Sequence, residues 1–133
     1  MRLGDRGAPA ILIVDDDDYV HAAVRAVLRR VTANVSRAAT VAEALATAAA
    51  APPDLAIIDV GLPDGDGYDL AAALKSGASG RTKVLILTGY APDPSAAQAS
   101  HVDAVVSKPF RLHDFVDTVE RLLAEPAPVA RRH

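Results

Sequence analysis

The chain has 133 residues, of which 50% are hydrophobic and 23% are charged, so it suits one globular domain and not a disordered segment. Because it has no cysteine, disulfides, thiolate metal ligands and a cysteine nucleophile are excluded. The net charge of −3 argues against nucleic-acid binding, and no apolar run approaches the roughly 20 residues that a membrane span needs. We therefore expect a soluble cytoplasmic protein that has no secretory signal and contacts neither nucleic acid nor membrane.

Strands and helices are predicted to alternate along the chain. Short β-branched apolar runs indicate the strands, and apolar residues at three- and four-residue spacing indicate the helices. In the first half we expect a strand at 10–14, a helix at 19–30, a strand at 34–38, a helix at 40–50 and a strand at 55–58. After a loop at 61–67 we expect a helix at 68–75, a strand at 84–87, a short helix from about Pro94, a strand at 104–106, a helix at 112–123 and a frayed tail at 125–133.

This alternation predicts an α/β domain built from five strand–helix units. The strands would form a parallel sheet with helices on both faces, and ligands bind such sheets at the carboxyl ends of the strands. The residues that directly follow the predicted strands are Asp15 and Asp16, Asp59, Thr88 and Lys108. Three carboxylates, a hydroxyl and an ammonium group are therefore expected at one edge of the sheet.

Three carboxylates in one crevice repel one another unless they take up protons or bind a cation. Mg²⁺ is the expected cation, because its ligands are oxygens and none of the four histidines directly follows a predicted strand. A carboxylate can also act as a nucleophile and form an aspartyl phosphate. Four other aspartates are expected to be structural, since Asp17 and Asp18 begin a helix and Asp64 and Asp66 lie in a turn.

Four segments of the chain resemble the receiver domain of a two-component response regulator. They are ILIVDDD at the first strand, LAIIDVGLPDGDGYDL around Asp59, LILTG with Thr88, and VSKPF with Lys108. The resemblance implies a flavodoxin-like (βα)5 fold with strand order 2-1-3-4-5. It also implies a receiver domain over residues 8–124 and a C-terminal tail over 125–133.

The resemblance further implies a role for each site residue. Asp59 would accept the phosphoryl group, Thr88 would bind a phosphoryl oxygen, and Lys108 would pair with the phosphate. The Mg²⁺ ligands would be Asp15, Asp16, Asp59 and the backbone carbonyl of Gly61. The bond between Lys108 and Pro109 is expected to be cis.

A signalling role follows from the same resemblance. The phosphoryl donor would be a phosphohistidine on a sensor histidine kinase or a histidine phosphotransfer protein, and the phosphorylated form would control an output protein or domain. The resemblance also allows for a homodimer that forms on phosphorylation. Such a domain is a switch and not an enzyme, although it assists its own phosphorylation and dephosphorylation.

The chain departs from the receiver pattern near its fifth strand. Val105 stands where receivers usually carry Tyr or Phe, and His101 stands where Gly is expected. Val105 is short and stiff, so it has no ring to move between buried and exposed positions. Tyr90, in the sequence TGY after Thr88, is the nearby aromatic that we expect to take over the switching role.

Two other functions fit part of the pattern. One is a metal-dependent phosphohydrolase with an Asp nucleophile, similar to the haloacid dehalogenases. Those enzymes carry a second Asp two residues after the first, where this chain has Gly61. The other is a receiver-like interaction module that has lost phosphorylation, which the intact acidic pair, Thr88 and Lys108 argue against.

Overall fold

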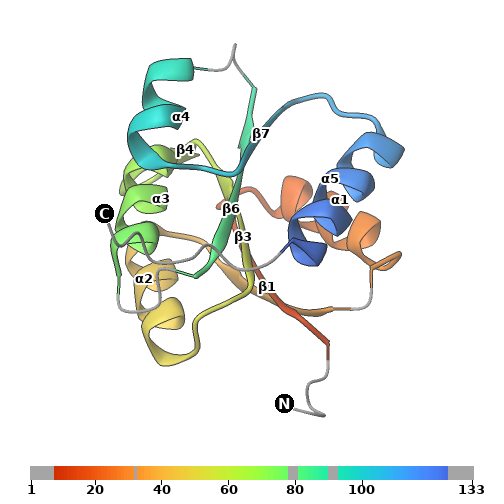
Figure 1. Cartoon of the computed structure of the whole chain (residues 1–133), viewed down its shortest axis with the longest axis horizontal. Coiled ribbons are helices and arrows are strands. Elements are labelled where there is room, and N and C mark those ends of the chain that lie inside the picture. The colour runs from red at the N-terminus through yellow and green to blue at the C-terminus, as the bar shows by residue number, and fades with distance from the viewer. Residues whose placement is uncertain (1–7, 32, 78–80, 90–92, 126–133) are drawn as a thin grey trace.

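The structure is a computed structural model that describes residues 8–31, 33–77, 81–89 and 93–125. In this part of the chain, parallel strands form a central sheet with helices on both faces (Figure 1). The strands of the sheet are β1 (Ala10–Val14), β2 (Asn34–Ala38), β3 (Leu55–Asp59), β6 (Lys83–Thr88) and β7 (Ala104–Ser107). The helices are α1 (Asp18–Leu28), α2 (Val41–Ala50), α3 (Gly67–Ser76), α4 (Pro94–Ser100) and α5 (Leu112–Ala124).

The strand order of the sheet is β2-β1-β3-β6-β7, and every neighbouring pair is parallel. The predicted order 2-1-3-4-5 of the flavodoxin-like fold is therefore confirmed, because β6 and β7 are the fourth and fifth strands of this sheet. The labels β4 (Gly61–Leu62) and β5 (Gly65–Asp66) belong to a separate antiparallel pair. The prediction of a plain loop over 61–67 was wrong, since Pro63 and Asp64 form a tight turn between these two-residue strands.

Each face of the sheet has its own apolar core. Helices α2, α3 and α4 cover a core that includes Leu12, Ile58 and Ile86, while α1 and α5 cover a core that includes Ile13 and Phe115 (Figure 1). All five side chains are fully buried. Burial of each contributes roughly 1.5–3 kcal/mol. Both faces of β1, β3 and β6 are covered, which explains why these strands read as continuous apolar runs.

The end of the first predicted helix needs correction, and the end of α4 explains a departure from the receiver pattern. Helix α1 ends at Leu28, two residues before the predicted end, because the N–H groups of Arg29 and Arg30 turn back to carbonyls only three residues earlier. Helix α4 ends at Ser100, and its C-cap His101 has a φ of 57°, which lies in the left-handed region. Glycine is favoured there, so the backbone explains why a glycine was expected at this position.

Aspartate side chains cap three of the described helices, α1, α3 and α4. Asp17 is the N-cap of α1 and Asp18 is its first residue, as predicted. Asp66 caps α3. Asp64 does more than form a turn, because its two carboxylate oxygens accept the N–H groups of Val41 at 2.7 Å and Ala42 at 3.1 Å. Asp64 thus attaches the β4–β5 hairpin to the start of α2.

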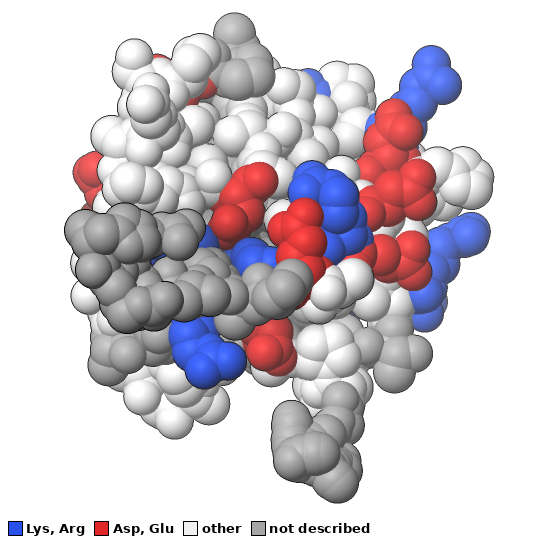
Figure 2. All heavy atoms as spheres, in the orientation of Figure 1, with Lys and Arg blue, Asp and Glu red and all other residues white. Residues whose placement is uncertain are grey.

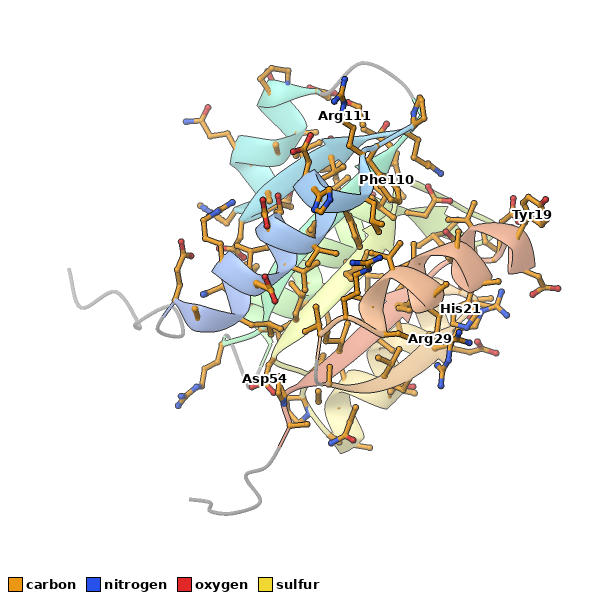
Figure 3. The ribbon with its side chains drawn as sticks, turned by 90° about the vertical axis from the view of Figure 1, so that its right-hand side faces the viewer. Tyr19, His21, Arg29, Asp54, Phe110 and Arg111 are labelled. Atoms are coloured by element: carbon orange, nitrogen blue, oxygen red, sulfur yellow. The ribbon has the colours of Figure 1, made fainter. Side chains whose placement is uncertain are left out.

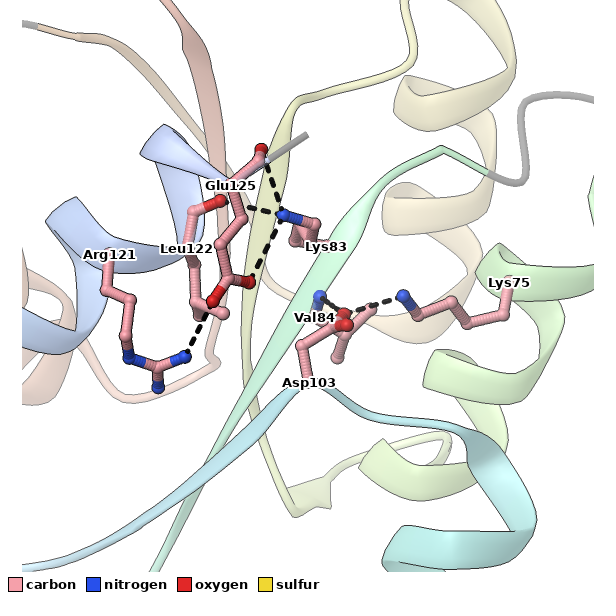
Figure 4. Close-up of polar contacts among 7 residues, drawn as sticks. All are labelled: Lys75, Lys83, Val84, Asp103, Arg121, Leu122 and Glu125. Carbon is pink, nitrogen blue, oxygen red and sulfur yellow. Dashed lines mark hydrogen bonds and ion pairs between the residues drawn. The ribbon is translucent and has the colours of Figure 1, made fainter. Parts of the chain in front are cut away.

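Two lysines hold the beginning of β6, as Figure 4 shows. The buried Lys83 Nζ donates to the Leu122 carbonyl at 2.9 Å and to the Glu125 carbonyl at 3.2 Å, which satisfies carbonyls at the end of α5. Lys75 Nζ donates to Asp103 Oδ2 at 2.6 Å, and the same oxygen accepts the backbone N–H at the second residue of β6. Strand β6, which ends at Thr88, is therefore anchored to the helical layers on both faces of the sheet.

Charge is unevenly distributed over the surface that Figure 2 shows. Acidic and basic side chains gather on the right-hand half of this view, where α1 and α5 lie in Figure 1. The region of α4, with the sequence PSAAQAS, is largely uncharged. Among the described residues, no helix has the length and apolar character to cross a membrane. Of the predicted tail 125–133, only Glu125 lies within the described residues.

Candidate functional site

The predicted site residues meet at the carboxyl edge of the sheet. Asp59 and Thr88 are the last residues of β3 and β6, while Asp15 and Lys108 directly follow β1 and β7. The Lys108 N–H donates to the Thr88 carbonyl at 2.7 Å, so the end of β7 is tied to the end of β6. The parallel register of the four strands thus carries these side chains to one place, as predicted from their positions in the sequence.

Three carboxylates form a cluster at this edge. Asp15, Asp16 and Asp59 each offer an oxygen, and these oxygens lie within 4.8 Å of one another. Asp15 is buried, Asp59 is partly buried and Asp16 is exposed, so the cluster opens toward solvent on one side. An oxygen-only cluster of this kind is the donor set that Mg²⁺ prefers.

Asp15 is the buried member of the cluster, with 1% of its surface exposed. Its Oδ1 accepts the Asp17 N–H at 2.8 Å, whereas Oδ2 is buried and has no hydrogen-bond partner in the described part of the chain. Burial raises the pKa of the Asp15 carboxyl from 3.8 to about 6, the hydrogen bond from Asp17 opposes this, and the charge of Asp59 adds to it. An unpartnered buried oxygen on a member of a carboxylate cluster fits a cation ligand.

Lys108 supplies positive charge on the other side of Asp59. Its Nζ lies 3.5 Å from Asp59 Oδ1, with 26% of the Lys108 side chain and 14% of the Asp59 side chain exposed. The bond from Lys108 to Pro109 is cis, as expected. Asp59 therefore lies between an ammonium group and two further carboxylates, so an anion bound to it would find a partner already in place.

Thr88 is 3% exposed and lines a cavity of 350 Å³ between α3 and α4. Val60, which follows Asp59, lines the same cavity, as do Tyr68 of α3 and Ala96 of α4. The cavity therefore adjoins the acidic cluster without containing its three carboxylates.

Gly67 packs against the backbone of Asp59, a contact that sequence reasoning missed. A Cβ at this residue would lie 2.5 Å from the Asp59 carbonyl oxygen and 2.9 Å from Val60 Cα, and the Gly67 N–H donates to the Val60 carbonyl at 2.8 Å. Close backbone approach explains this glycine, and the repeated glycines of DGDG were the available signal. Gly61 is exposed with open space around it, and the metal-binding role of its carbonyl stays a prediction.

Arg37 was also missed. Its Nε and Nη2 donate to the Asp15 carbonyl oxygen at 3.3 and 3.1 Å. The one available signal was its place near the end of the predicted second strand, beside the end of the first.

Val105 is the predicted switch position on β7 that lies within the described residues. Val105 is half-buried on β7, pairs with Ile86 and packs against the core beneath α3 and α4. Tyr90, the aromatic expected to take over the switching role, lies outside the described residues. Its role therefore stays a prediction.

Comparison with known proteins supports a single family. Residues 11–120 match the model of the response regulator receiver domain. The chain is 34% identical over 106 residues to the transcriptional regulatory protein KdpE of Mycobacterium tuberculosis, covering 80% of this chain and 47% of that protein. It is 37% identical over 109 residues to the photosynthetic apparatus regulatory protein RegA of Rhodovulum sulfidophilum, covering 80% of this chain and 58% of that protein. The chain thus spans about half the length of these curated relatives.

Solved structures agree with this result. A CheY-like receiver domain protein from Methanospirillum hungatei superposes with a TM-score of 0.81 at 29% identity, covering 88% of this chain and 94% of that one. The chemotaxis response regulator CheY4 of Vibrio cholerae superposes with a TM-score of 0.80 at 27% identity, covering 87% and 99%. Since both the fold and most of the sequence match, the chain belongs to the response regulator receiver domains, the signalling switches of two-component systems.

Proposed function

We propose that Asp59 receives a phosphoryl group from a phosphohistidine of a sensor histidine kinase or histidine phosphotransfer protein, and that phosphorylation switches the control of an output. One observation carries this proposal. Asp59 ends β3, the central strand of the sheet, with Lys108 Nζ at 3.5 Å on one side and the carboxylates of Asp15 and Asp16 on the other. Asp15 is too deeply buried to meet a phosphoryl donor, and Asp16 is exposed at the turn before α1.

The acidic residues fit a Mg²⁺ ion. Asp15 through Oδ2, Asp16, Asp59 and the carbonyl of Gly61 would hold it, and the bound ion would neutralise charge on the phosphoryl oxygens. The unpartnered Asp15 Oδ2 is the observation that supports this fit.

In the transfer, an Asp59 carboxylate oxygen attacks the phosphorus while the bond from phosphorus to the histidine nitrogen of the donor breaks. The histidine nitrogen leaves with the bonding pair, and Asp59 becomes an acyl phosphate. The Lys108 ammonium group pairs with the new phosphate, and the Thr88 hydroxyl donates to a phosphoryl oxygen. Hydrolysis by water returns the Asp59 carboxylate and inorganic phosphate, so the domain assists both its phosphorylation and its dephosphorylation.

Signal transmission is proposed to run through the segment that follows β6. Thr88 borders a 350 Å³ cavity, which leaves room for its side chain and its surroundings to rearrange on phosphorylation. Val105 has no ring to follow that motion, so we assign the role to the segment from Thr88 to Ala99, with Tyr90 changing its burial.

The wider setting belongs to the same proposal. The receiver domain covers residues 8–124, with a tail over 125–133, and acts in the cytoplasm on an output protein or domain. The domain does not itself contact nucleic acid or membrane, and it is free to form a homodimer on phosphorylation. Because the relatives are about twice as long, the output is proposed from the family and not from this chain.

Incubation with Mg²⁺ and acetyl phosphate, followed by intact-mass measurement, tests the proposal. We expect the mass of one phosphoryl group to be added to the wild-type chain and nothing to be added in EDTA or to Asp59→Asn. An unmodified wild-type chain would instead support an interaction module that has lost phosphorylation. Continuous turnover of small phosphate esters would support a phosphohydrolase.

A further inference from the structure

The carboxyl end of β2 fixes the backbone of Asp15 on both sides of its Cα atom. The Asp15 N–H donates to the Ala38 carbonyl at 3.0 Å, and the Asp15 carbonyl accepts from Arg37 Nε at 3.3 Å and Nη2 at 3.1 Å. In the β1–β2 ladder Arg37 is paired with Ile13, two residues before Asp15. The edge strand therefore holds the peptide groups before and after the buried member of the acidic cluster.

The same guanidinium group reaches the start of α1. Its Nη1 lies 2.8 Å from Asp18 Oδ1, and because the Asp18 side chain is 92% exposed this ion pair adds little stability. Its effect is geometric, since one planar group connects the end of β1 to the first turn of α1. The short segment between those two points carries Asp16, a second member of the cluster. A lysine at position 37 would offer one ammonium group in place of three fixed nitrogens.

The position of the unpartnered Asp15 Oδ2 depends on how the Asp15 backbone is held. Oδ1 accepts the Asp17 N–H, so the buried Oδ2 is the Asp15 oxygen that has no hydrogen-bond partner among the described residues and is available to a cation. A shift of the Asp15 backbone would move Oδ2 relative to Asp16 and Asp59. Mg²⁺ requires near-ideal octahedral geometry at about 2.0–2.1 Å, whereas Ca²⁺ accepts longer and less regular coordination. A displaced ligand should therefore weaken Mg²⁺ binding more than Ca²⁺ binding.

We propose that Arg37 is a positioning residue for the metal site, which sets the ligand oxygen of Asp15 by holding the Asp15 carbonyl and the start of α1 together. This inference rests on the proposed binding of Mg²⁺ by the acidic cluster. Charge alone would act in the opposite direction, because removal of a cation beside carboxylates strengthens cation binding. Loss of a group that orients a metal ligand typically weakens metal affinity by about 10–100-fold.

The test compares Mg²⁺ and Ca²⁺ affinities of Arg37→Gln, Arg37→Lys and the wild-type chain by NMR titration. We expect Mg²⁺ binding to weaken about 10-fold in both variants and Ca²⁺ binding to weaken less. The matched control is Arg29→Gln, an exposed arginine on the same face of the molecule as α1 (Figure 3), which should bind like the wild type. Acetyl phosphate labelling of Asp59 should be slow at limiting Mg²⁺ in the Arg37 variants and recover at saturating Mg²⁺.

Several results would overturn the proposal. Unchanged or tighter Mg²⁺ binding in Arg37→Gln would show that the charge of Arg37 dominates. Wild-type affinity in Arg37→Lys would show that three fixed donors are unnecessary, and equal losses for both ions would indicate a general structural effect. Failure of the wild-type chain itself to bind Mg²⁺ would remove the proposed metal site, and with it the role of Arg37.

Discussion

Replacement of Asp15 by Asn tests whether this buried carboxylate is destabilising until a cation binds. The folded-state pKa of Asp15 is raised from 3.8 to about 6 by burial, so the folded protein binds a proton more tightly than the unfolded chain does. The stabilisation that comes from this tighter proton binding is therefore fully present below pH 3.8. It is lost as the pH rises through about 6, where the folded-state carboxyl ionises. At about 1.4 kcal/mol per pKa unit, the ionised form costs up to about 3 kcal/mol.

Without metal, we expect Asp15→Asn to be more stable than the wild type at pH 7 by up to about 3 kcal/mol. The Asn amide oxygen can still accept the Asp17 N–H, and its NH₂ group would face the carboxylates of Asp16 and Asp59. The assay is urea unfolding in EDTA across the pH range. The gain should shrink as the pH falls below about 6 and vanish below 3.8.

Addition of Mg²⁺ should reverse this effect. The wild type should gain stability with the logarithm of the Mg²⁺ concentration, whereas Asp15→Asn should gain little. The control is Asp17→Asn, which changes an exposed N-cap residue to one that caps equally well. The reasoning is refuted if Asp15→Asn is the less stable protein in EDTA at pH 7, or if the difference does not depend on pH.

Three further substitutions test a close backbone contact, a buried lysine and a left-handed backbone conformation. Gly67→Ala should lower the free energy of unfolding by about 1–3 kcal/mol and slow the labelling of Asp59, because the new Cβ would lie 2.5 Å from the Asp59 carbonyl oxygen. The control Gly89→Ala, whose Cβ would have nothing within 4 Å, should change neither. Lys83→Met should lower the free energy of unfolding by about 1–3 kcal/mol, since it leaves carbonyls at the end of α5 without a donor; an unchanged urea midpoint would contradict this. His101→Gly should raise stability by up to about 1 kcal/mol by relieving a left-handed φ of 57°, and a drop in thermal midpoint would count against it.

Most of the site could be predicted because parallel strands bring their carboxyl ends together. Asp59 and Thr88 end buried strands, and Asp15 and Lys108 follow them directly, so strand periodicity alone was enough to place these side chains at one edge. The strand order itself came from the resemblance, since periodicity does not state which strands are neighbours.

Two residues whose contacts were missed, Arg37 and Lys83, act across long sequence separations. Arg37 contacts the Asp15 carbonyl 22 residues away, and Lys83 contacts the Leu122 carbonyl 39 residues away. These contacts depend on the register of the edge strand and on where a helix ends, which local patterns do not define. The predicted strand began at Val84, one residue after Lys83. A charged residue is rarely buried, yet Lys83 is buried here because the end of α5 supplies acceptors for its ammonium group.

Identification of the phosphorylated residue tests the central claim most directly. The wild-type chain would be treated with Mg²⁺ and acetyl phosphate, reduced with borohydride, which converts an aspartyl phosphate to homoserine, and sequenced by mass spectrometry. We predict homoserine at position 59 and nowhere else, and none when the phosphodonor is omitted. Homoserine at Asp15 or Asp16, or none at position 59 in a chain that gained a phosphoryl group, would contradict the account.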